Sequence, residues 1–418
     1  MNIKYYINNI LNLFKKRGLR LSVLTVLIPI LLQLIYIRYI SYNVDESFFG
    51  DFILYISFIA LLASSLFSIS TAALTRYINQ TSDKERLINE FLTLQFPLNL
   101  IGVVAIFFYS YYYVGKGLEI FLILSIYFVL LNRYSINKTI IFQLIKRKQF
   151  LNISVLEKIA RFFFPLIIFY FFQSKGALLY GLLLGYFLLV LYSSFFTKGF
   201  KRKIVFSRKK VKIYFLYAYP LMFISIAVWI ISLSDRYFIE SYIGSSEVGI
   251  YSVIAQVSGF ASILGSIFTI YVQPLIFKEF SKNKKKAMKT YMSYIQKSFF
   301  VFISAYIIFL FIPRDFFTIL IRPEIISEPR YYFLFHLLVL SSLLITFITI
   351  LTNVFYLNNK LHILSFFWVI AAIINLIGNN FISIYGIYAV ALSKGFSYII
   401  MLLFMLYSTR SIVKRLAD

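Results

Sequence analysis

The chain has 418 residues, of which 61% are hydrophobic and 20% aromatic, and its mean hydropathy of +0.83 excludes the composition of a soluble globular protein. Its net charge of +26 comes from Lys and Arg residues that are segregated along the chain, a pattern of membrane topology and not of nucleic-acid binding. The lack of Cys excludes disulfides and thiol catalysis, and two His residues, His336 and His362, are too few for a histidine metal site. We therefore expect no nucleic-acid partner and no metal.

Apolar stretches long enough to cross a bilayer follow one another through the whole chain, and they predict about 12 transmembrane helices in an all-α integral membrane protein. The first is longer than the apolar core of a signal peptide, so we expect it to remain as a span. In chain order the predicted spans are Leu19–Ile40, Phe52–Leu74, Phe91–Tyr113, Leu118–Ile141, Leu151–Phe172, Ala177–Phe196, Ile213–Tyr242, Val248–Val272, Ile295–Ile312, Tyr331–Leu357, Ile363–Phe381 and Gly386–Tyr407.

The distribution of Lys and Arg orients these spans. Of the 42 basic residues, 31 lie in the N-terminal segment, in the even-numbered connections and in the C-terminal tail, whereas seven lie in the odd-numbered connections. An excess of Lys and Arg marks the cytoplasmic side of a membrane. We therefore expect both termini to be cytoplasmic in a multi-pass protein of the bacterial cytoplasmic (inner) membrane.

A basic connection near the middle of the chain divides the spans into two groups of six. It predicts an N-lobe (1–200), a cytoplasmic linker (201–212) that lies on lipid headgroups, and a C-lobe (213–418). Six spans per half give both halves the same orientation, so the halves should be related by an axis along the membrane normal.

Three short motifs recur in the two halves at nearly constant offsets. Arg38-Tyr39-Ile40 matches Arg236-Tyr237-Phe238, Gly50-Asp51-Phe52 matches Gly249-Ile250-Tyr251, and the stretch from Ser64 to Ile69 matches that from Gly265 to Ile270. The offsets are 198, 199 and 201 residues, and they indicate a weak internal repeat.

Charged residues lie inside several of the predicted spans. Glu157, Lys158 and Arg161 share or border one helix face of the fifth span, and each charge at mid-bilayer costs roughly 2.5–3.5 kcal/mol on the insertion scale. They should face the protein interior, either as a structural Glu157–Arg161 pair or as a cationic surface for an anionic substrate, with Glu157 holding the arginine or exchanging a proton. Lys394 lies deep in the last span and predicts a cavity residue, whereas Arg133 is either a cavity residue or an interfacial anchor.

The outer end of the seventh span carries Asp235 and Arg236. They are either a helix-end pair facing headgroups or, because Arg38 occupies the matching place in the first half, part of an inward-facing pair of arginines. Asp235 is then a second residue for proton coupling or charge pairing.

Several motifs resemble those of a known family. One motif is Ser234-Asp235-Arg236-Tyr237-Phe238-Ile239 followed by Glu247-Val248-Gly249-Ile250-Tyr251-Ser252. Two others are the stretch from Thr71 to Tyr77, and Asn375 followed by Tyr385 to Ala391. These motifs resemble those of bacterial polysaccharide flippases of the O-antigen (Wzx) type. These proteins belong to the multidrug/oligosaccharidyl-lipid/polysaccharide (MOP) exporter superfamily.

The resemblance implies a MATE-like fold with two six-helix lobes around a central cavity that opens alternately to either side. It also implies an undecaprenyl-diphosphate-linked oligosaccharide as substrate. Transport would be driven by an ion gradient, commonly of protons, with no bound cofactor. The implied partners are membrane lipids, a polysaccharide polymerase and chain-length machinery. Only Asp235 and Arg236 lie in the quoted motifs; the other charged residues are inferred from their depth in the spans.

Two other functions stay open from the sequence. A drug/cation antiporter of the same superfamily needs acidic residues in its cavity, whereas the charges inside these spans are mainly basic. A membrane polymerase or glycosyltransferase could use Asp45 and Glu46 as a carboxylate pair, but the chain has no outer domain to present a substrate, so we expect no enzymatic activity.

Overall fold

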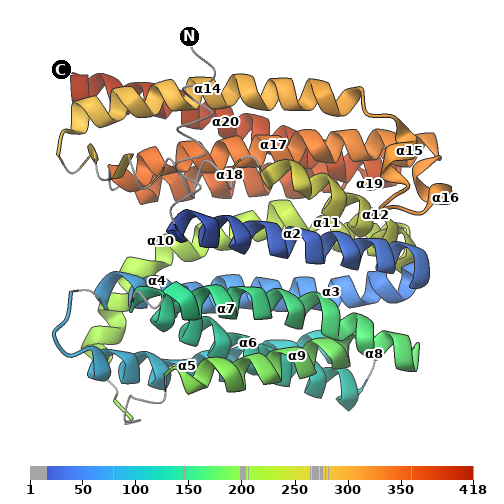
Figure 1. Ribbon diagram of the computed structural model, residues 1–418, viewed down its shortest axis with the longest axis horizontal. Helices are drawn as coiled ribbons and strands as arrows, with labels where there is room; N and C mark the ends of the chain where they lie inside the picture. Colours follow the sequence, from blue (N-terminus) through green and yellow to red (C-terminus); the bar gives the residue numbers. More distant parts are fainter. Residues whose placement is uncertain are drawn as a thin grey trace. The chain divides into compact units, whose positions relative to one another are not determined.

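The computed structural model describes residues 17–78, 80–115, 117–144, 147–197, 204–205, 207–263, 265, 273, 276–277, 279–280, 282–358 and 360–417. Within these ranges all regular structure is helical and there is no strand, so the predicted all-α class is confirmed (Figure 1).

The helices are α2 (Arg17–Asn43), α3 (Glu46–Leu62), α4 (Ser68–Tyr77), α5 (Lys84–Phe108), α6 (Leu118–Gln143), α7 (Arg147–Lys158), α8 (Phe164–Phe172), α9 (Ala177–Phe195), α10 (Arg208–Leu233), α11 (Asp235–Tyr242), α12 (Ser245–Ser258), α14 (Lys284–Leu310), α15 (Arg314–Phe317), α16 (Pro323–Ile326), α17 (Pro329–Leu357), α18 (Leu361–Asn379), α19 (Ile382–Tyr385) and α20 (Ile387–Ala417). Short non-α segments interrupt some of them: the π-helices η1 (Ala63–Phe67), η2 (Tyr109–Val114) and η3 (Ile159–Phe163), and the 3₁₀-helix η4 (Gly259–Ser262).

Nine helical segments in the described part of the chain are long and apolar enough to cross a membrane, which confirms a multi-pass membrane protein. The predicted spans 19–40, 151–172 and 248–272 are not among the nine. In the second of these, three charged residues lower the hydropathy; in the third, η4 ends α12 and the rest lies partly outside the described residues. The number twelve and the side of the termini stay predictions.

The chain forms two compact units. Unit 1 comprises Met1–Tyr39 and Leu66–Ala218, and unit 2 comprises Ile40–Ser65 and Tyr219–Asp418. Helix α3 therefore belongs to unit 2 although it lies early in the sequence. The predicted lobes, 1–200 and 213–418, and the linker 201–212 divide the chain by its sequence halves and stay a prediction.

Unit 1 is built on α5, α6, α7 and α9, which run side by side (Figure 1). Apolar residues from α4, α5, α6 and the start of α10 form one buried cluster, of which Ala73, Leu74 and Phe91 are fully inaccessible. The cluster explains why the first part of α10 belongs to this unit.

A buried carboxylate adds to that attachment. Glu90 of α5, whose side chain is only 4% exposed, accepts hydrogen bonds from Lys210 Nζ at 2.5 Å and from the Tyr214 hydroxyl at 2.8 Å. A buried charge is tolerated where it is paired and hydrogen-bonded. Pro220 is the second residue after the unit boundary and, lacking an N–H, interrupts the backbone ladder there.

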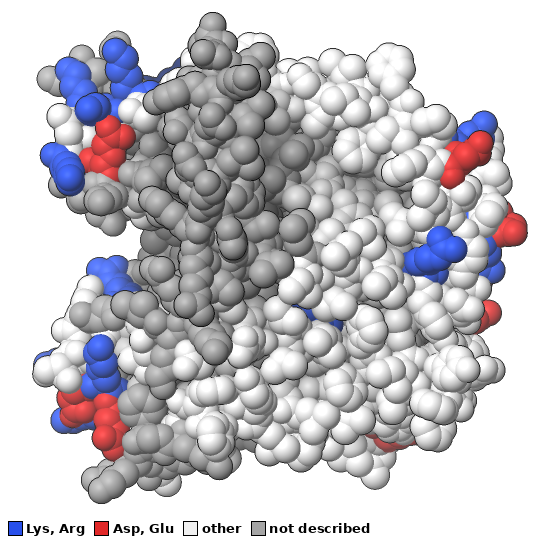
Figure 2. Space-filling model, in the orientation of Figure 1, with Lys and Arg blue, Asp and Glu red and all other residues white. Residues whose placement is uncertain are grey.

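Unit 2 is centred on α17, which packs against α12, α14, α18 and α20, while α3 packs along α12. On the face shown in Figure 2 the charged side chains of the described residues lie mainly near the two ends of the long axis, and the white band between them carries few charges. Such an apolar band is what contact with lipid chains requires.

Candidate functional site

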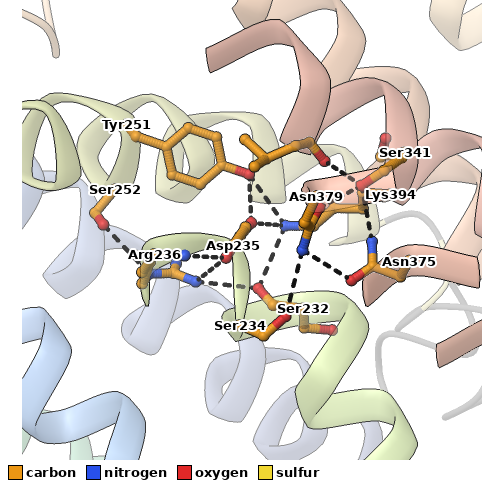
Figure 3. A network of polar contacts seen from close by, with 12 residues as sticks. Ser232, Ser234, Asp235, Arg236, Tyr251, Ser252, Ser341, Asn375, Asn379 and Lys394 are labelled. Carbon is orange, nitrogen blue, oxygen red and sulfur yellow. Dashed lines mark hydrogen bonds and ion pairs between the residues drawn. The ribbon is translucent and has the colours of Figure 1, made fainter. Parts of the chain in front are cut away.

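A short break between α10 and α11 places an acid inside unit 2. Ser234 forms the turn, and Asp235, the first residue of α11, is completely buried; a helix N-terminus favours a carboxylate. Its Oδ1 accepts from the backbone N–H of Arg236 at 3.0 Å and from Arg236 Nη1 at 3.2 Å. Its Oδ2 accepts from the Tyr251 hydroxyl and from Lys394 Nζ (Figure 3).

Two cations share this one carboxylate. Arg236 and Lys394 are 8% and 7% exposed, and both also donate to the backbone carbonyl of Ser232, at 3.0 and 3.3 Å. Arg236 Nε reaches Ser252 Oγ at 3.3 Å. The cluster thus joins α10, α11, α12 and α20 and carries one net positive charge in an interior position.

The cluster opens onto a cavity of about 190 Å³ within unit 2. Arg236 and Lys394 both line it, together with hydroxyl and amide groups. The full lining is Ser232, Arg236, Ala255, Gln256, Leu338, Ser341, Ser342, Ile345, Lys394 and Tyr398. The wall therefore offers cationic and neutral hydrogen-bond donors to whatever enters.

Amide groups of α18 extend the polar contacts next to Lys394. Asn375 and Asn379, both fully buried, hydrogen-bond each other at 3.3 Å; Asn375 Nδ2 donates to Ser393 Oγ at 3.1 Å, and Ser393 in turn donates to Asn379 Oδ1. Each amide has its partners within the protein, so this group stabilises the packing of α18 on α20 (Figure 3).

In unit 1, Glu157 of α7 and Arg161, both described in the structure, form no ion pair with each other. The structural Glu157–Arg161 pair, one of the two alternatives predicted from the sequence, is therefore not formed. Glu157 Oε2 instead accepts from Lys138 Nζ at 2.5 Å and from the Tyr134 hydroxyl at 2.9 Å, both on α6. Lys138 lies near the C-terminal end of α6, and its long side chain brings the charge to Glu157.

Arg161 lies on η3, halfway along the helical run from α7 to α8, and its side chain is exposed. Pro165, four residues after Arg161, has no N–H to donate to the Arg161 carbonyl. The Phe164 N–H, just before it, donates to the carbonyl of Ile159 five residues back, and this hydrogen bond forms the π-turn. The hydroxyls of Tyr127 and Tyr186 lie within electrostatic range of the guanidinium. Lys158, half-buried, precedes it by three residues.

Arg38 on α2 is exposed and Arg133 on α6 is half-buried. The structure thus brings Asp235, Arg236 and Lys394 together in unit 2 and Glu157 and Lys158 near Arg161 in unit 1. Their roles in transport stay predictions. Across the residues described, no group of His, Cys, Asp and Glu could hold a metal ion.

The sequence reasoning missed Tyr251, Ser232 and Lys138 as partners of these charges. Tyr251 lies in the repeated Gly-Ile-Tyr motif, which was a signal, but nothing in its spacing from Asp235 indicated that its hydroxyl binds the carboxylate. Ser232 contributes a backbone oxygen, so its side chain carries no signal at all.

Comparison with known proteins supports the fold and the family. The chain resembles the structure of an inward-facing multidrug resistance MATE family transporter of the MOP superfamily, with a TM-score of 0.66 at 13% identity, covering 93% of this chain and 95% of that chain. It resembles the lipid II flippase MurJ in an inward closed conformation, with a TM-score of 0.65 at 16% identity and coverages of 95% and 90%. No curated protein matches it by sequence.

The model of a sequence family described as polysaccharide biosynthesis protein matches residues 16–279, more than half of the chain. The shared helical fold agrees with the MATE-like arrangement expected from the sequence motifs. The resemblance to polysaccharide flippases of the MOP type is confirmed, and the chain belongs to the polysaccharide biosynthesis protein family.

Proposed function

We propose that this protein is a flippase that moves undecaprenyl-diphosphate-linked oligosaccharide units from the inner to the outer leaflet of the bacterial cytoplasmic membrane. The units would serve O-antigen or another surface polysaccharide. The proposal includes alternating access, coupling to an ion gradient, cytoplasmic termini, and delivery to a polymerase with its chain-length machinery.

The observation that carries the proposal is the buried cluster of Asp235, Arg236 and Lys394, which exposes two cationic side chains to one cavity. Arg and Lys donors suit phosphate oxygens. Because Asp235 already binds both cations, an entering phosphate competes with a carboxylate, which keeps the attraction moderate and allows release on the other side.

The size of the cavity limits what it can hold. About 190 Å³ is below the roughly 300–1,000 Å³ of sites for drug-sized ligands. It therefore fits the phosphate end of the substrate, and the sugars would occupy space outside it, with the prenyl chain in lipid.

Arg161 supplies the second cationic position. An exposed arginine halfway along a membrane helix would cost several kcal/mol against lipid, so it should face a water-filled passage. Among the described residues, Glu157 forms its ion pair with Lys138 and not with Arg161, so this carboxylate does not compete with an anion for the guanidinium.

The two rival functions find less support. For an antiporter, Asp235 would have to bind a drug cation, yet both of its oxygens already bind Arg236 and Lys394. For an enzyme, Asp45 would have to be a catalytic acid, yet its carboxylate caps α3 by accepting from the N–H groups of Ser47 and Phe48.

The test uses a strain that lacks the gene, from which undecaprenyl-linked oligosaccharide is extracted and assigned to a leaflet. We expect complete units to accumulate on the cytoplasmic side, and the Lys394→Met variant to restore less export than the Lys289→Met variant, which changes an exposed lysine of α14. Complete units on the outer leaflet, unpolymerised, would refute flipping and favour a polymerase.

A further inference from the structure

Two glycines of α9 bring its backbone directly against the π-turn that carries Arg161. A Cβ atom on Gly185 would lie 2.6 Å from the carbonyl oxygen of Ala160 in η3. One on Gly181, a turn earlier, would lie 2.4 Å from the carbonyl oxygen of Phe164, at which α8 begins. Real Cβ contacts are essentially never shorter than 3.0 Å, so a side chain at either place would displace backbone. Small residues let membrane helices approach this closely, and α9 thereby contacts the chain on both sides of Arg161.

The π-turn is a conformation that depends on its surroundings. Turns of this type are rare, and many of them lie at functional sites. In η3 the hydrogen bond from Phe164 N–H to Ile159 O closes the turn. Pro165 has no N–H with which to restore the regular α-helical bond. The two glycine contacts fall inside this turn and directly after it, so α9 packs against the widened part of the helical run and fixes its backbone.

The next residue of α9, Tyr186, lies beside the side chain of Arg161. Tyr186 is 2% exposed, and its ring meets that of Tyr127 on α6 edge to face, with centroids 5.2 Å apart. Both hydroxyls lie within electrostatic range of the guanidinium, as does that of Tyr36 on α2. All three tyrosines are buried, so tight packing holds their hydroxyl groups in place around the guanidinium.

These tyrosine hydroxyls are neutral acceptors, and that affects how Arg161 can bind an anion. A guanidinium forms hydrogen bonds to a carboxylate or phosphate that are about twice as strong as those to a neutral group. Hydroxyl groups can therefore orient the guanidinium and still give way to an entering phosphate. The nearby carboxylate of Glu157 forms its ion pair with Lys138 and accepts from Tyr134. The arrangement suits a side chain that binds and releases an anion in every transport cycle.

We propose that α9 positions Arg161 for the anionic group of the substrate. Gly181 and Gly185 hold the π-turn against α9, and the Tyr186 hydroxyl, supported by Tyr127, orients the guanidinium. All of them act through Arg161 and are therefore positioning residues. The proposal rests on the proposed flippase function, in which Arg161 meets the anionic part of the substrate, and it identifies the residues that set the place and direction of this arginine.

The test is a double-mutant cycle on export, because a positioning residue has no further effect once Arg161 is gone. Tyr186→Phe removes one hydroxyl group and should lower export roughly threefold to tenfold. In an Arg161→Ala background the same change should lower export no further. Tyr192→Phe is the matched control, since it removes a hydroxyl from an exposed residue of the same helix and should leave export unchanged. Normal export from Tyr186→Phe, or losses that simply add in the double variant, would overturn the proposal.

Gly185→Ala tests the backbone contact in the same way. Its methyl group forces α9 and η3 apart, and export should fall at least about tenfold in the native background but no further in Arg161→Ala. The control is Gly259→Ala, which places a methyl group where nothing lies within 4 Å. Normal export from Gly185→Ala would refute the role of the glycines. Since this variant could fail to fold, its protein level and unfolding midpoint are measured too, and Tyr186→Phe, which keeps the packing, then decides.

A binding experiment separates this proposal from the flippase. Inorganic diphosphate should raise the unfolding midpoint of the purified protein. The rise should be smaller in Arg161→Ala and in Tyr186→Phe, and the double variant should match Arg161→Ala. That result, with an unchanged leaflet distribution in the strain that lacks the gene, would support the positioning and refute flipping. Normal flipping with additive losses would refute only the positioning, and a midpoint that diphosphate does not move in the native protein would refute Arg161 as an anion site.

Discussion

Replacing Asp235 by Asn should destabilise this protein more than replacing Lys394 by Met. Asp235 is completely buried and is, within the described part of the chain, the acid that pairs with Arg236 and Lys394, which are less than a tenth exposed. Asp235→Asn leaves two buried cations without a counter-charge. Removing one partner of a buried ion pair costs about 3–5 kcal/mol, and we expect a loss in that range.

Lys394→Met has a smaller expected effect because it leaves the carboxylate paired. Asp235 keeps Arg236 Nη1 at 3.2 Å and the Tyr251 hydroxyl, while the lost contacts are the ammonium's bond to Asp235 and its hydrogen bonds to Ser232 O and Tyr251. At a net contribution of about 1 kcal/mol for each hydrogen bond, the loss should be roughly 1–3 kcal/mol. The double variant should be more stable than Asp235→Asn alone, since it holds one unpaired cation in place of two.

The assay is thermal unfolding of the purified protein in one detergent and at one scan rate, because membrane proteins often unfold irreversibly. Lys289→Met on the exposed side of α14 is the control for losing a lysine charge. If Lys394→Met lowers the midpoint as much as Asp235→Asn does, and the double variant is lower still, the charge argument is wrong.

Three further predictions concern unit 1. Arg161→Ala should lower flipping severalfold at normal protein level and insertion, whereas Arg161→Lys should retain more activity; near-normal export from the alanine variant would contradict a passage role for η3. Glu157→Gln should weaken export by releasing the Lys138 ammonium, which lies 2.5 Å away, and Lys138→Met should restore part of it; equal export from all three proteins would refute this. Glu90→Gln should lower the unfolding midpoint, because the buried carboxylate accepts a hydrogen bond from Lys210 and removal of a hydrogen-bonded charge costs roughly 1–3 kcal/mol. Glu85→Gln, on the same helix, is the control. An unchanged midpoint in Glu90→Gln would show that this pair contributes nothing to stability.

Much of the class and family was predictable because it depends on properties that a linear chain displays. Stretches of apolar residues must become helices in lipid, since no water is there to satisfy the backbone. The motif that contains Asp235 and Arg236 was recognisable for the same reason: its residues are contiguous in the sequence.

One of the two alternatives for the fifth span, the Glu157–Arg161 pair, failed because it depends on how helix faces meet. Glu157 and Arg161 share a face by spacing, yet Glu157 binds Lys138 and Tyr134 of the neighbouring helix α6. The fifth predicted span is not among the nine candidate membrane helices, because its three charged residues lower its hydropathy. The partner of Glu157 does not follow from spacing alone.

The sequence by itself determined an all-helical membrane protein, its family and the presence of charges at depth. Only the tertiary structure decided that Lys394 meets Asp235 across 159 residues of chain, and that α3 packs along α12. The physical reason is that a membrane helix is apolar toward lipid and toward its neighbours alike. With no amphipathic stripe, its sequence does not say which side packs, and the contacts depend on the shapes of helices that meet only in the folded chain.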